Sequence, residues 1–496
     1  MLLSELMKKA GIEVLSCGSD TDPLIQGIAY DSRIVKKGDL FISIPGLKVN
    51  GDQFIEKAVE AGAVAVFSEN PQSGIGVPWF QIKNTRLSLG RLAESFWDID
   101  QNSLVNVGIT GTNGKTTTSY FYKHLMDQLV GSSVSWMFGT VESYLGETVL
   151  DSTHTTPESI NVFRQIGTAS KPPRSIVMEV SSHALSLSRV SGMKYDIAVW
   201  TNLTQDHLDF HGTMEEYYKA KKLLFTDYLK KNGTAIVNID DQWGKRLNQE
   251  LSGAVKIVTY GKSKNADVRV TDSKCDWSGC SVELEYKSEN FKFHSPLKGH
   301  FNVYNMVAMV AGAFALSIDS QKVQSAFSSL NRVPGRMDKV PVDAPFVAIV
   351  DYAHTPDALV NVLRAARSLT SGELICVFGC GGDRDKSKRP IMAQAVTSNC
   401  DEAIVTSDNP RSEKPDSIIA HIVKGVPLDF PHLVISDRRE AIECAIKRAK
   451  AGDCIVIAGK GHEEYQEVNG VRHHFSDIET VQEIFEKLDK NNTGDK

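Results

Sequence analysis

Residues 104–119 read LVNVGITGTNGKTTTS, an apolar run followed by two glycines, a lysine and a series of hydroxyl side chains. The apolar run predicts a buried strand, and the residues after it predict a tight loop that opens a helix. Gly111 and Gly114 let backbone N–H groups approach an anion without a Cβ in the way. Lys115 can neutralise outer phosphates, and the Thr116 hydroxyl can contact Mg²⁺. The segment therefore predicts a strand–loop–helix unit that binds a triphosphate, within a sheet covered by helices.

This loop differs from the standard phosphate-loop pattern at one position. The pattern places a glycine where this chain has Ile109, and here the glycine stands one place earlier, at Gly108. We therefore expect a tighter loop than the pattern describes. The alternative is a buried strand that enters an ordinary glycine turn, and the order of strand, glycine, lysine and hydroxyls argues against it.

Length and composition limit the fold class and the partners. A chain of 496 residues is too long for one hydrophobic core, so we expect about two to four domains. No segment approaches the roughly 20 apolar residues of a membrane span, and residues 1–14 predict an amphipathic helix rather than a signal peptide. The net charge of −6 offers no basic field to nucleic acid. We expect a cytoplasmic monomer that neither inserts into a membrane nor binds nucleic acid.

The eight cysteines predict neither a zinc site nor a disulfide framework. Cys376 and Cys380 stand close together at the end of a predicted strand, but no second pair matches them. The other cysteines are scattered singly.

Three consecutive blocks predict an α/β protein with three domains. Residues 1–97 predict a small N-terminal α/β domain. Residues 98–335 contain near-continuous apolar runs between helices, which predict a central parallel sheet covered on both faces, with antiparallel hairpins added at one edge by residues 268–293. Residues 336–496 alternate strands and helices and predict a Rossmann-like domain, with disorder from residue 489. The expected strands are 27–30, 40–44, 63–68, 79–82, 105–110, 175–180, 197–202, 235–238, 347–351, 374–378, 402–406 and 454–458, and the expected helices are 53–61, 356–369, 390–398, 417–424 and 438–449.

Polar side chains follow the central strands, at the edge where open α/β sheets bind ligands. Glu179 and His183 come after one strand, and His207 lies in the segment TNLTQDHLDFH that follows the next. A carboxylate and imidazoles beside a phosphate loop are suitable ligands for Mg²⁺ or its water molecules. Each residue alone could equally be structural, so the prediction rests on their grouping.

The third block carries a second set of charged strand ends. Arginine, aspartate, lysine and glutamate follow four of its strands, in the segments 351–356, 379–386, 408–411 and 459–463. Neighbouring strand ends with these side chains predict a crevice that matches the charges of a small zwitterion. A solvated rim of ordinary turns is the alternative.

The chain resembles the Mur ligases of bacterial peptidoglycan synthesis in a series of motifs that occur in the same order. These are GTNGKTT at 111–117, EVSSH at 179–183, TNLTQDHLDFHG at 201–212, GxFNxxN at 299–305, VPGRM at 333–337, DYAHTPD at 351–357, GCGGDRDKxKRP at 379–390, DNPR at 408–411 and GKGHE at 459–463. The resemblance covers nearly the whole chain.

The resemblance implies an ATP-dependent amide ligase. ATP phosphorylates the γ-carboxylate of UDP-N-acetylmuramoyl-L-alanyl-D-glutamate, and an amino group then attacks the acyl phosphate and expels phosphate. The implied ATP-binding residues are Gly111, Thr112, Asn113, Gly114, Lys115, Thr116, Thr117, Asn302, Arg336 and Asp351. The implied Mg²⁺ ligands are Thr116, Glu179, His207 and Lys221, and the implied catalytic residues are Lys115, Glu179, His207 and Lys221.

The same resemblance assigns the UDP-sugar to the first two blocks. The implied contacts are Tyr30, Ser32, Leu47, Lys48, Val49, His154, Thr155, Thr156, Ser181, Leu187 and Arg189. His154 stands where the family more often has asparagine, and Leu187 stands where a polar residue can help to bind the sugar.

Lys221 is one of three lysines in the helical segment YYKAKKLLF, whose composition alone favours a solvated basic face. Aligned on Tyr217 and Ala220, however, Lys221 falls where the family carries a lysine carbamylated to N6-carboxylysine. A carbamate is an anion that can bind a second Mg²⁺, which an ammonium group cannot do.

The third amino acid of the stem peptide is either meso-diaminopimelate or L-lysine, which differ by one distal carboxylate. The motif at 408–411 resembles the diaminopimelate type, and a guanidinium such as that of Arg411 or Arg384 binds a carboxylate in bidentate fashion. The implied diaminopimelate-binding residues are Arg384, Asp408, Asn409, Pro410, Arg411, Gly459 and Glu463. The alternatives are the lysine-adding ligase, a folylpolyglutamate synthase and a non-catalytic nucleotide-binding module.

Overall fold

A computed structural model describes residues 1–19, 21–46, 49–152, 154–276, 278–330 and 332–493. The predicted contacts of Leu47 and Lys48 lie outside these residues. The chain divides into two compact units. The first consists of Met1–Thr110, Val130–Ala198 and Ala220–Ala235, and the second of Gly111–Leu129, Val199–Lys219 and Ile236–Lys496. Strands and helices alternate in both, so the predicted α/β class is confirmed.

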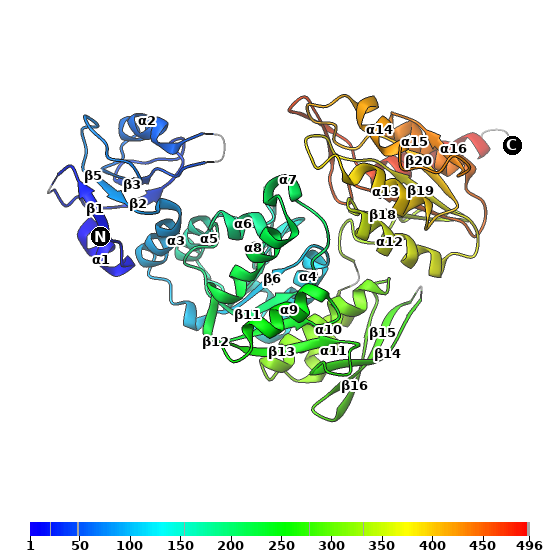
Figure 1. The fold of residues 1–496 in the computed structure, drawn as a ribbon, viewed down its shortest axis with the longest axis horizontal. Helices are drawn as coiled ribbons and strands as arrows, with labels where there is room; N and C mark the ends of the chain where they lie inside the picture. Colours follow the sequence, from blue (N-terminus) through cyan, green and yellow to red (C-terminus); the bar gives the residue numbers. More distant parts are fainter. Residues whose placement is uncertain (20, 47–48, 153, 277, 331, 494–496) are drawn as a thin grey trace. The chain divides into compact units, whose positions relative to one another are not determined.

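The N-terminal sheet of the first unit has the strand order β1-β5-β4-β3-β2 (Figure 1). Strands β2 to β5 pair in parallel, and β1 runs antiparallel to β5. The predicted N-terminal helix forms because Leu3, Leu6 and Ala10 share one buried face, and it ends at Gly11 in the left-handed conformation. The elements are α1 (Leu3–Ala10), β1 (Val14–Cys17), β2 (Gly27–Ala29), β3 (Asp39–Ile42), α2 (Ile55–Glu60), β4 (Ala65–Ser68), β5 (Trp79–Ile82) and α3 (Thr85–Phe96).

A second sheet region of the first unit contains β10 paired in parallel with β6 and β7. Ser175 of β10 lies opposite Val105 of β6 and opposite Ser135 of β7. Antiparallel strands β8 and β9 extend it. The sequence did not reveal β8 or β9, because their side chains are half-buried or exposed and carry no apolar alternation. The elements are β6 (Val105–Thr110), β7 (Ser135–Phe138), β8 (Glu142–Leu145), β9 (Thr148–Asp151), α5 (Ser159–Thr168), β10 (Ser175–Glu179) and α6 (Ser182–Ser186).

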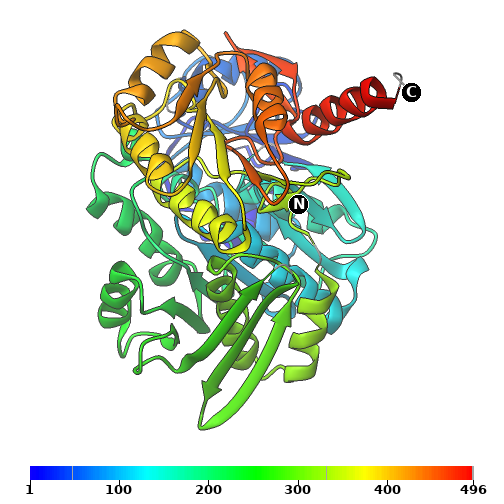
Figure 2. The same cartoon turned by 90° about the vertical axis from the view of Figure 1, so that its right-hand side faces the viewer.

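In the second unit, β13 pairs in parallel with β14, and β14, β15 and β16 form the predicted antiparallel hairpins (Figure 2). The unexpected feature here is a disulfide between Cys275 and Cys280, which lie directly opposite each other on β14 and β15. This cross-strand pairing depends on the hairpin register and is not visible in the spacing. The elements are α7 (Leu208–His211), α9 (Gln242–Leu251), β13 (Lys256–Gly261), β14 (Val268–Asp276), β15 (Gly279–Tyr286), β16 (Glu289–Ser295), α10 (Phe301–Ala315) and α11 (Ser320–Ser329).

The C-terminal sheet has the order β17-β18-β22-β19-β20-β21, and its strands from β18 to β21 run in parallel. One apolar layer packs α12, α13 and α14 on this sheet, and a separate layer packs α15 and α16. The predicted doubly wound domain is therefore confirmed. The elements are β17 (Asp338–Lys339), β18 (Val347–Asp351), α12 (Pro356–Leu369), β19 (Leu374–Phe378), α13 (Lys388–Thr397), β20 (Glu402–Val405), α14 (Pro415–Val423), β21 (His432–Val434), α15 (Arg438–Arg448), β22 (Cys454–Ala458), β23 (Tyr465–Val468), β24 (Val471–His474) and α16 (Asp477–Thr493).

The predicted disorder from residue 489 is wrong up to Thr493, because α16 continues to that residue. A helix already nucleated by the packed residues Val481 and Ile484 gains one backbone hydrogen bond for each residue it adds. Four further elements contain residues of both units: α4 (Lys115–Val130), β11 (Tyr195–Trp200), α8 (Met214–Thr226) and β12 (Leu229–Asn238). Across the described ranges, no helix combines the length and apolar character that a membrane crossing requires.

Candidate active site

The loop that follows β6 depends on two glycines in conformations that L side chains rarely adopt. The φ angle is 152° at Gly111 and 85° at Gly114. A Cβ on Gly111 would lie 1.8 Å from Oγ1 of Thr201, and one on Gly114 would lie 2.4 Å from Oδ1 of Asn305. The loop backbone therefore touches these side chains directly, and a larger residue at either position would displace it.

The segment that begins at Thr201 fixes the shape of this loop. The N–H of Thr112 donates to the carbonyl of Asn202, and the N–H of Asn113 donates to the Asn202 side chain, both at 2.9 Å. The hydroxyl of Thr201 donates to the carbonyl of Asn113 at 2.6 Å. Thr204 closes the contact with an N–H that donates to Oγ1 of Thr112 at 3.0 Å. Thr201, Asn202 and Thr204 therefore support the phosphate loop, a role that the sequence did not identify.

Lys115 folds back over the loop. Its Nζ donates to the carbonyl oxygens of Gly111 at 3.0 Å and Thr112 at 2.9 Å. The next residue, Thr116, accepts a hydrogen bond of 3.0 Å from Nη2 of Arg336. Two cationic groups are thus held at the helix start where an anion is favoured.

A cavity of about 430 Å³ opens beside this loop. Of the predicted nucleotide-binding residues, the lining contains Asn113, Gly114, Thr116, Thr117, Arg336 and Asp351. Asn302 does not line the cavity but accepts a hydrogen bond of 2.9 Å from Asn305, which does. The lining also includes residues that the sequence left unassigned: Thr201, Asn202, Thr204, Asn238, Asp240, Asp241, Tyr260, His300, Phe301, Tyr304, Asn305, Asp357, Ala358, Asn361 and Val362.

Two carboxylates in the lining belong to the C-terminal sheet and its first helix. Asp351 ends β18 and accepts N–H groups of Met337 at 2.7 Å and Ala353 at 2.8 Å, while burial raises its pKa. Asp357, in the first turn of α12, accepts the side-chain amide of Asn113 at 2.7 Å, and burial raises its pKa as well. Asp357 lies in the quoted motif DYAHTPD, so the motif contained a signal for this contact.

The predicted metal ligands have different surroundings. Glu179 is fully buried, and its carboxylate accepts the N–H of Thr140 at 2.8 Å and the Thr140 hydroxyl at 3.0 Å. Lys221 is buried on α8. Among the residues that the structure describes, no group of three or more His, Cys, Asp or Glu side chains is arranged to hold a metal ion. Mg²⁺ usually keeps several waters and binds through one or two carboxylates and substrate phosphates, so a single carboxylate such as that of Glu179 is chemically suitable for it.

His207 is the N-cap residue of α7 and has a left-handed backbone, with φ = 54°. Its Nε2 lies 3.3 Å from Oδ2 of Asp206, and Nζ of Lys388 lies 3.7 Å from Oδ1 of the same carboxylate. Burial opposes ionisation of Asp206, but His207 and Lys388 outweigh burial and lower its pKa. Asp206 therefore stays an anion that orients His207.

The predicted UDP-sugar contacts fall into two groups. Around Tyr30, burial raises the pKa of the phenol, whose oxygen accepts the amide of Asn161 at 3.1 Å. Ser32 is buried and Val49 is exposed.

The second group surrounds Thr156, whose hydroxyl donates to the backbone carbonyl of Glu179 at 2.7 Å and accepts the N–H of Ser181 at 3.0 Å. Thr155 lies 3.2 Å from the hydroxyl of Thr140, and Arg189 lies 3.6 Å from Glu158. Although His154 is exposed at the surface, desolvation of its imidazole lowers its pKa, and the nearby charge of Arg189 acts in the same direction. Leu187 ends α6.

The residues predicted to form the zwitterion crevice lie in the loops after β22, β19 and β20, which are neighbours in the C-terminal sheet. Gly381 lies between the two arginine side chains, since a Cβ on it would lie 2.9 Å from Nη1 of Arg411 and 3.9 Å from the aliphatic Cγ of Arg384. Arg411 donates to the carbonyl of Gly382 at 2.8 Å and lies 3.6 Å from Glu467, whereas Arg384 is exposed. The two side chains thus lie on either side of Gly381, and their binding of a carboxylate stays a prediction.

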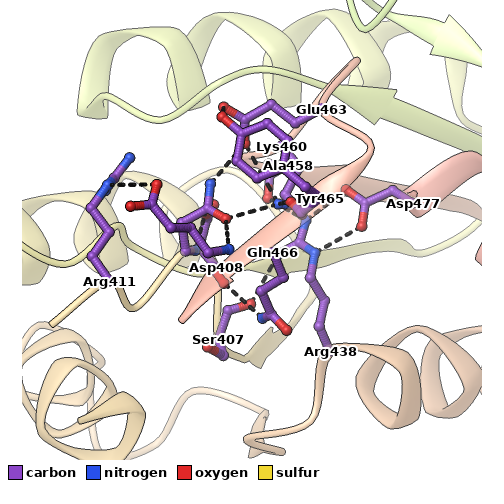
Figure 3. A network of polar contacts seen from close by, with 12 residues as sticks. Ser407, Asp408, Arg411, Arg438, Ala458, Lys460, Glu463, Tyr465, Gln466 and Asp477 are labelled. Carbon is purple, nitrogen blue, oxygen red and sulfur yellow. Dashed lines mark hydrogen bonds and ion pairs between the residues drawn. The ribbon is translucent and has the colours of Figure 1, made fainter. Parts of the chain in front are cut away.

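The acidic side of the crevice comes from the loops after β20 and β22 (Figure 3). Gly459 has φ = 119°, and a Cβ on it would lie 2.4 Å from Oδ2 of Asp408. Burial opposes ionisation of Asp408, but Lys460 and Arg438 lower its pKa. Glu463 accepts the side-chain amide of Asn409 at 2.8 Å, and burial with the nearby Asp408 raises its pKa. The loops of the predicted crevice therefore carry two arginines, Arg384 and Arg411, and two carboxylates, Asp408 and Glu463. Pro410 lies between these two groups in the loop.

The phosphate loop and the cavity beside it suit a protein that binds a nucleoside triphosphate, and comparison with known families identifies the class as ATP-dependent amide ligases. Family models match three segments: "Mur ligase family, catalytic domain" at residues 24–97, "Mur ligase middle domain" at 109–313 and "Mur ligase, glutamate ligase domain" at 335–461. The chain belongs to the Mur ligase family.

Individual relatives extend over nearly the whole chain. One from Syntrophomonas wolfei is 43% identical over 490 residues, covering 98% of this chain and 99% of the relative, and one from Aquifex aeolicus is 42% identical over 461 residues, covering 93% of each. Both bear the name UDP-N-acetylmuramoyl-L-alanyl-D-glutamate–2,6-diaminopimelate ligase. A solved structure with that name is 34% identical, with a TM-score of 0.66 and coverage of 99% of this chain and 100% of that one.

Proposed function

We propose that the protein is an ATP-dependent, ADP-forming amide ligase that joins meso-diaminopimelate to UDP-N-acetylmuramoyl-L-alanyl-D-glutamate in peptidoglycan synthesis. The observation that carries this proposal is the 43% identity over 490 residues to a ligase of that name. The charged crevice supports it, because an arginine pair beside a carboxylate pair suits an amino acid with a distal carboxylate and a distal ammonium. A folylpolyglutamate synthase and a non-catalytic nucleotide-binding module have no comparable support.

In this proposal the loop from Gly111 to Thr117 receives the triphosphate. Lys115 and Arg336 offset the negative charge that grows on the transferred phosphoryl group. Asp351 is assigned to ATP binding because it lines the cavity, and Asn302 because it accepts a hydrogen bond from Asn305, which lines it. The γ-carboxylate of the acceptor forms a bond to the γ-phosphorus of ATP, and the bond to ADP breaks.

The second step is aminolysis. The amino group of diaminopimelate attacks the acyl carbon, phosphate leaves with the bonding electron pair, and the ammonium formed loses a proton to give the amide. Arg411 and Arg384 bind the distal carboxylate in this assignment, and Glu463 and Asp408 face the distal ammonium. These contacts orient the amino acid and contribute to catalysis through proximity.

Mg²⁺ is the proposed cofactor. Thr116, Glu179, His207 and a carbamylated Lys221 are the side chains assigned to it, and the ion supplies charge neutralisation at the phosphates when it is bound. The UDP-sugar is assigned to the first two domains. The proposed domain boundaries lie at residues 97 and 335. We also propose that the protein is a cytoplasmic monomer.

A phosphate-release assay tests the function. The purified protein is incubated with ATP, Mg²⁺ and UDP-N-acetylmuramoyl-L-alanyl-D-glutamate, and each of meso-diaminopimelate, L-lysine and L-glutamate is added separately. We expect release that requires the UDP-sugar and is fastest with diaminopimelate. A folate acceptor in place of the UDP-sugar is the control. Preference for lysine, or release that needs the folate, would reject the proposal.

A further inference from the structure

A fully buried lysine lies beneath the charged crevice. Lys460, in the loop between β22 and β23, has a relative exposure of 0%. Its Nζ donates to the carbonyl of Tyr465, to Oδ1 of Asn409 at 3.3 Å and to Oε2 of Glu463 at 3.5 Å (Figure 3). A lysine is almost never fully buried without such partners.

Two of these partners, Asn409 and Glu463, are themselves crevice residues and follow different strands. Asn409 follows β20, and Glu463 follows β22. The amide of Asn409 donates to the same Oε2 of Glu463 at 2.8 Å, and Oδ1 of Asn409 also accepts the N–H of Glu467 at 2.9 Å. Lys460 thus closes a triangle of hydrogen bonds that fixes the direction of the Glu463 carboxylate. The Glu463 side chain keeps 13% of its surface exposed, so its carboxylate is not sealed off.

A second buried cation is already matched by its own carboxylate. Arg438 donates from Nε and Nη2 to the two oxygens of Asp477 at 2.8 and 2.7 Å, and both side chains are fully buried. Its remaining bonds go to the backbone carbonyls of Ala458 at 3.0 Å and Ser407 at 3.4 Å. This pair therefore anchors the two strand ends and adds no net charge.

The charges around Lys460 then leave one uncompensated anion. Arg411 pairs with Glu467 at 3.6 Å, and this pair adds no net charge. The other charged residues labelled in Figure 3 are the cations Lys460 and Arg438 and the carboxylates Asp408, Glu463 and Asp477, which together have a formal net charge of −1. Arg438 is matched by Asp477, so Lys460 balances one of the other two carboxylates. The single remaining charge equals that of one ammonium group.

We propose that Lys460 is a positioning residue for amino-acid binding, which holds Glu463 and Asn409 in the arrangement that receives the ammonium of the amino-acid substrate and limits the local charge to −1. This inference rests on the proposed function. It assigns Lys460 no contact with the reacting atoms.

The ionisation of the crevice carboxylates is consistent with this role. Burial and Asp408 raise the pKa of Glu463, whereas Lys460 and the amide of Asn409 act in the opposite direction. Without Lys460, two neighbouring carboxylates would share a buried site, which favours uptake of a proton by one of them. Protonated Glu463 would lose the charge that attracts an ammonium.

The experiment compares Lys460→Met with the wild-type protein in the phosphate-release assay. Methionine retains much of the lysine volume and removes the charge and the donors. We expect KM for diaminopimelate to rise about tenfold or more, because a hydrogen-bonded charge partner of Glu463 is lost. KM for ATP and for the UDP-sugar should stay within about twofold, and kcat at saturating diaminopimelate should change much less than KM, since positioning acts on binding.

Lys123→Met is the matched control. Lys123 is also a buried lysine, and it pairs with Asp127 on α4 at 2.6 Å without contacting the crevice. Its KM for diaminopimelate should remain that of the wild type. If Lys460→Met does not fold, Lys460→Gln keeps an amide donor while removing the charge, and the same rise in KM is expected.

The outcomes separate the two proposals. An inactive wild-type protein rejects the proposed function. An active wild type, together with a folded Lys460 variant whose KM for diaminopimelate is unchanged or lower, overturns the role of Lys460. A rise in the KM of all three substrates would also overturn it, because that result describes a general structural role.

Discussion

At the scale of single residues, amino-acid binding in the proposed crevice depends on the hydrogen-bond donors that Arg411 can offer to a ligand. Its Nη1 donates to one backbone carbonyl, and its Nε lies 3.6 Å from Glu467, so the rest of its fork retains donors for a carboxylate. The left-handed backbone at Arg411, with φ = 52°, directs this side chain, and Gly381 provides the space beside it. The planar fork explains why an arginine at this position fits a substrate with a distal carboxylate.

The first prediction concerns that guanidinium. Arg411→Ala should raise KM for diaminopimelate about 10- to 100-fold, because the distal carboxylate loses a charged hydrogen-bond partner. KM for ATP and for the UDP-sugar should be almost unchanged, and lysine should remain a poor substrate because Arg384 is still present. Steady-state kinetics with both amino acids measures this, with Arg411→Lys as the variant that keeps charge without the fork. An unchanged KM for diaminopimelate would contradict the assignment.

A second prediction concerns Lys221, which is buried on α8. If its carbamate serves as a metal ligand, Lys221→Ala should be largely inactive, and a short carboxylic acid added to the assay should partly restore turnover by replacing the lost carboxylate. Lys219→Ala is the control on the same helix, since Lys219 is exposed and pairs with Glu216 at the surface. Full activity of Lys221→Ala would show that no carbamate is needed.

At the scale of elements, prediction from sequence succeeded where burial leaves a continuous pattern. The strands at Val105–Thr110, Val347–Asp351 and Cys454–Ala458 are confirmed to the residue, because both faces of these parallel strands are covered. Strands β8, β9, β23 and β24 were missed, since their side chains are half-buried or exposed and their sequence carries no apolar period. The short strand β7 was missed as well, although it is buried. The pairing partner, rather than the local sequence, defines such strands.

The candidate site follows the same division. The phosphate loop could be predicted because local glycine conformations define it. The contact of Asn202 with that loop could not, since it joins segments far apart in the chain, and only membership of a family motif pointed to the contact of Asp357. The disulfide between Cys275 and Cys280 likewise depends on the hairpin register. Long-range contacts of this kind leave no periodic signal in the sequence.

A prediction at this scale concerns the ends of β20 and β22, which are joined by Arg438 of α15. Arg438→Met should lower the free energy of unfolding by about 3–5 kcal/mol, because Asp477 is left buried without its partner. The neighbouring Arg439 forms an exposed pair with Glu483, with side-chain exposures of 40% and 54%, so Arg439→Met should cost less than about 1 kcal/mol. Urea unfolding measures both variants.

The double variant Arg438→Met with Asp477→Leu provides the decisive comparison. Removing both charges should recover part of the lost stability, because no buried charge then remains unpaired. A double variant that is no more stable than Arg438→Met would show that the backbone contacts of Arg438, rather than its charge pairing, maintain these strand ends.

At the scale of the whole molecule, stability at low pH reports on carboxylates that are anchored in the fold. Glu413 receives hydrogen bonds from Arg389 at 2.8 and 3.1 Å, and these hold the pKa of Glu413 at about 2, well below its usual value of 4.5. Arg389 is itself buried, so water cannot take its place as the hydrogen-bond partner of Glu413. The folded state therefore binds a proton at Glu413 less readily than the unfolded state does, and stability rises with pH between these two pKa values.

We therefore expect Glu413 to contribute its full stabilisation above about pH 4.5 and to lose it progressively as the pH falls toward 2. Glu413→Gln should lower stability at pH 7 by on the order of 1–2 kcal/mol after allowance for solvent screening. The difference between variant and wild type should shrink as the pH falls from 4.5, because the wild-type carboxylate becomes protonated while glutamine does not change. Calorimetric Tm values at pH 7, 4 and 3 measure this convergence. A difference that is the same at all three pH values would mean that the ionisation of Glu413 does not contribute, and that the loss in the variant comes from packing alone.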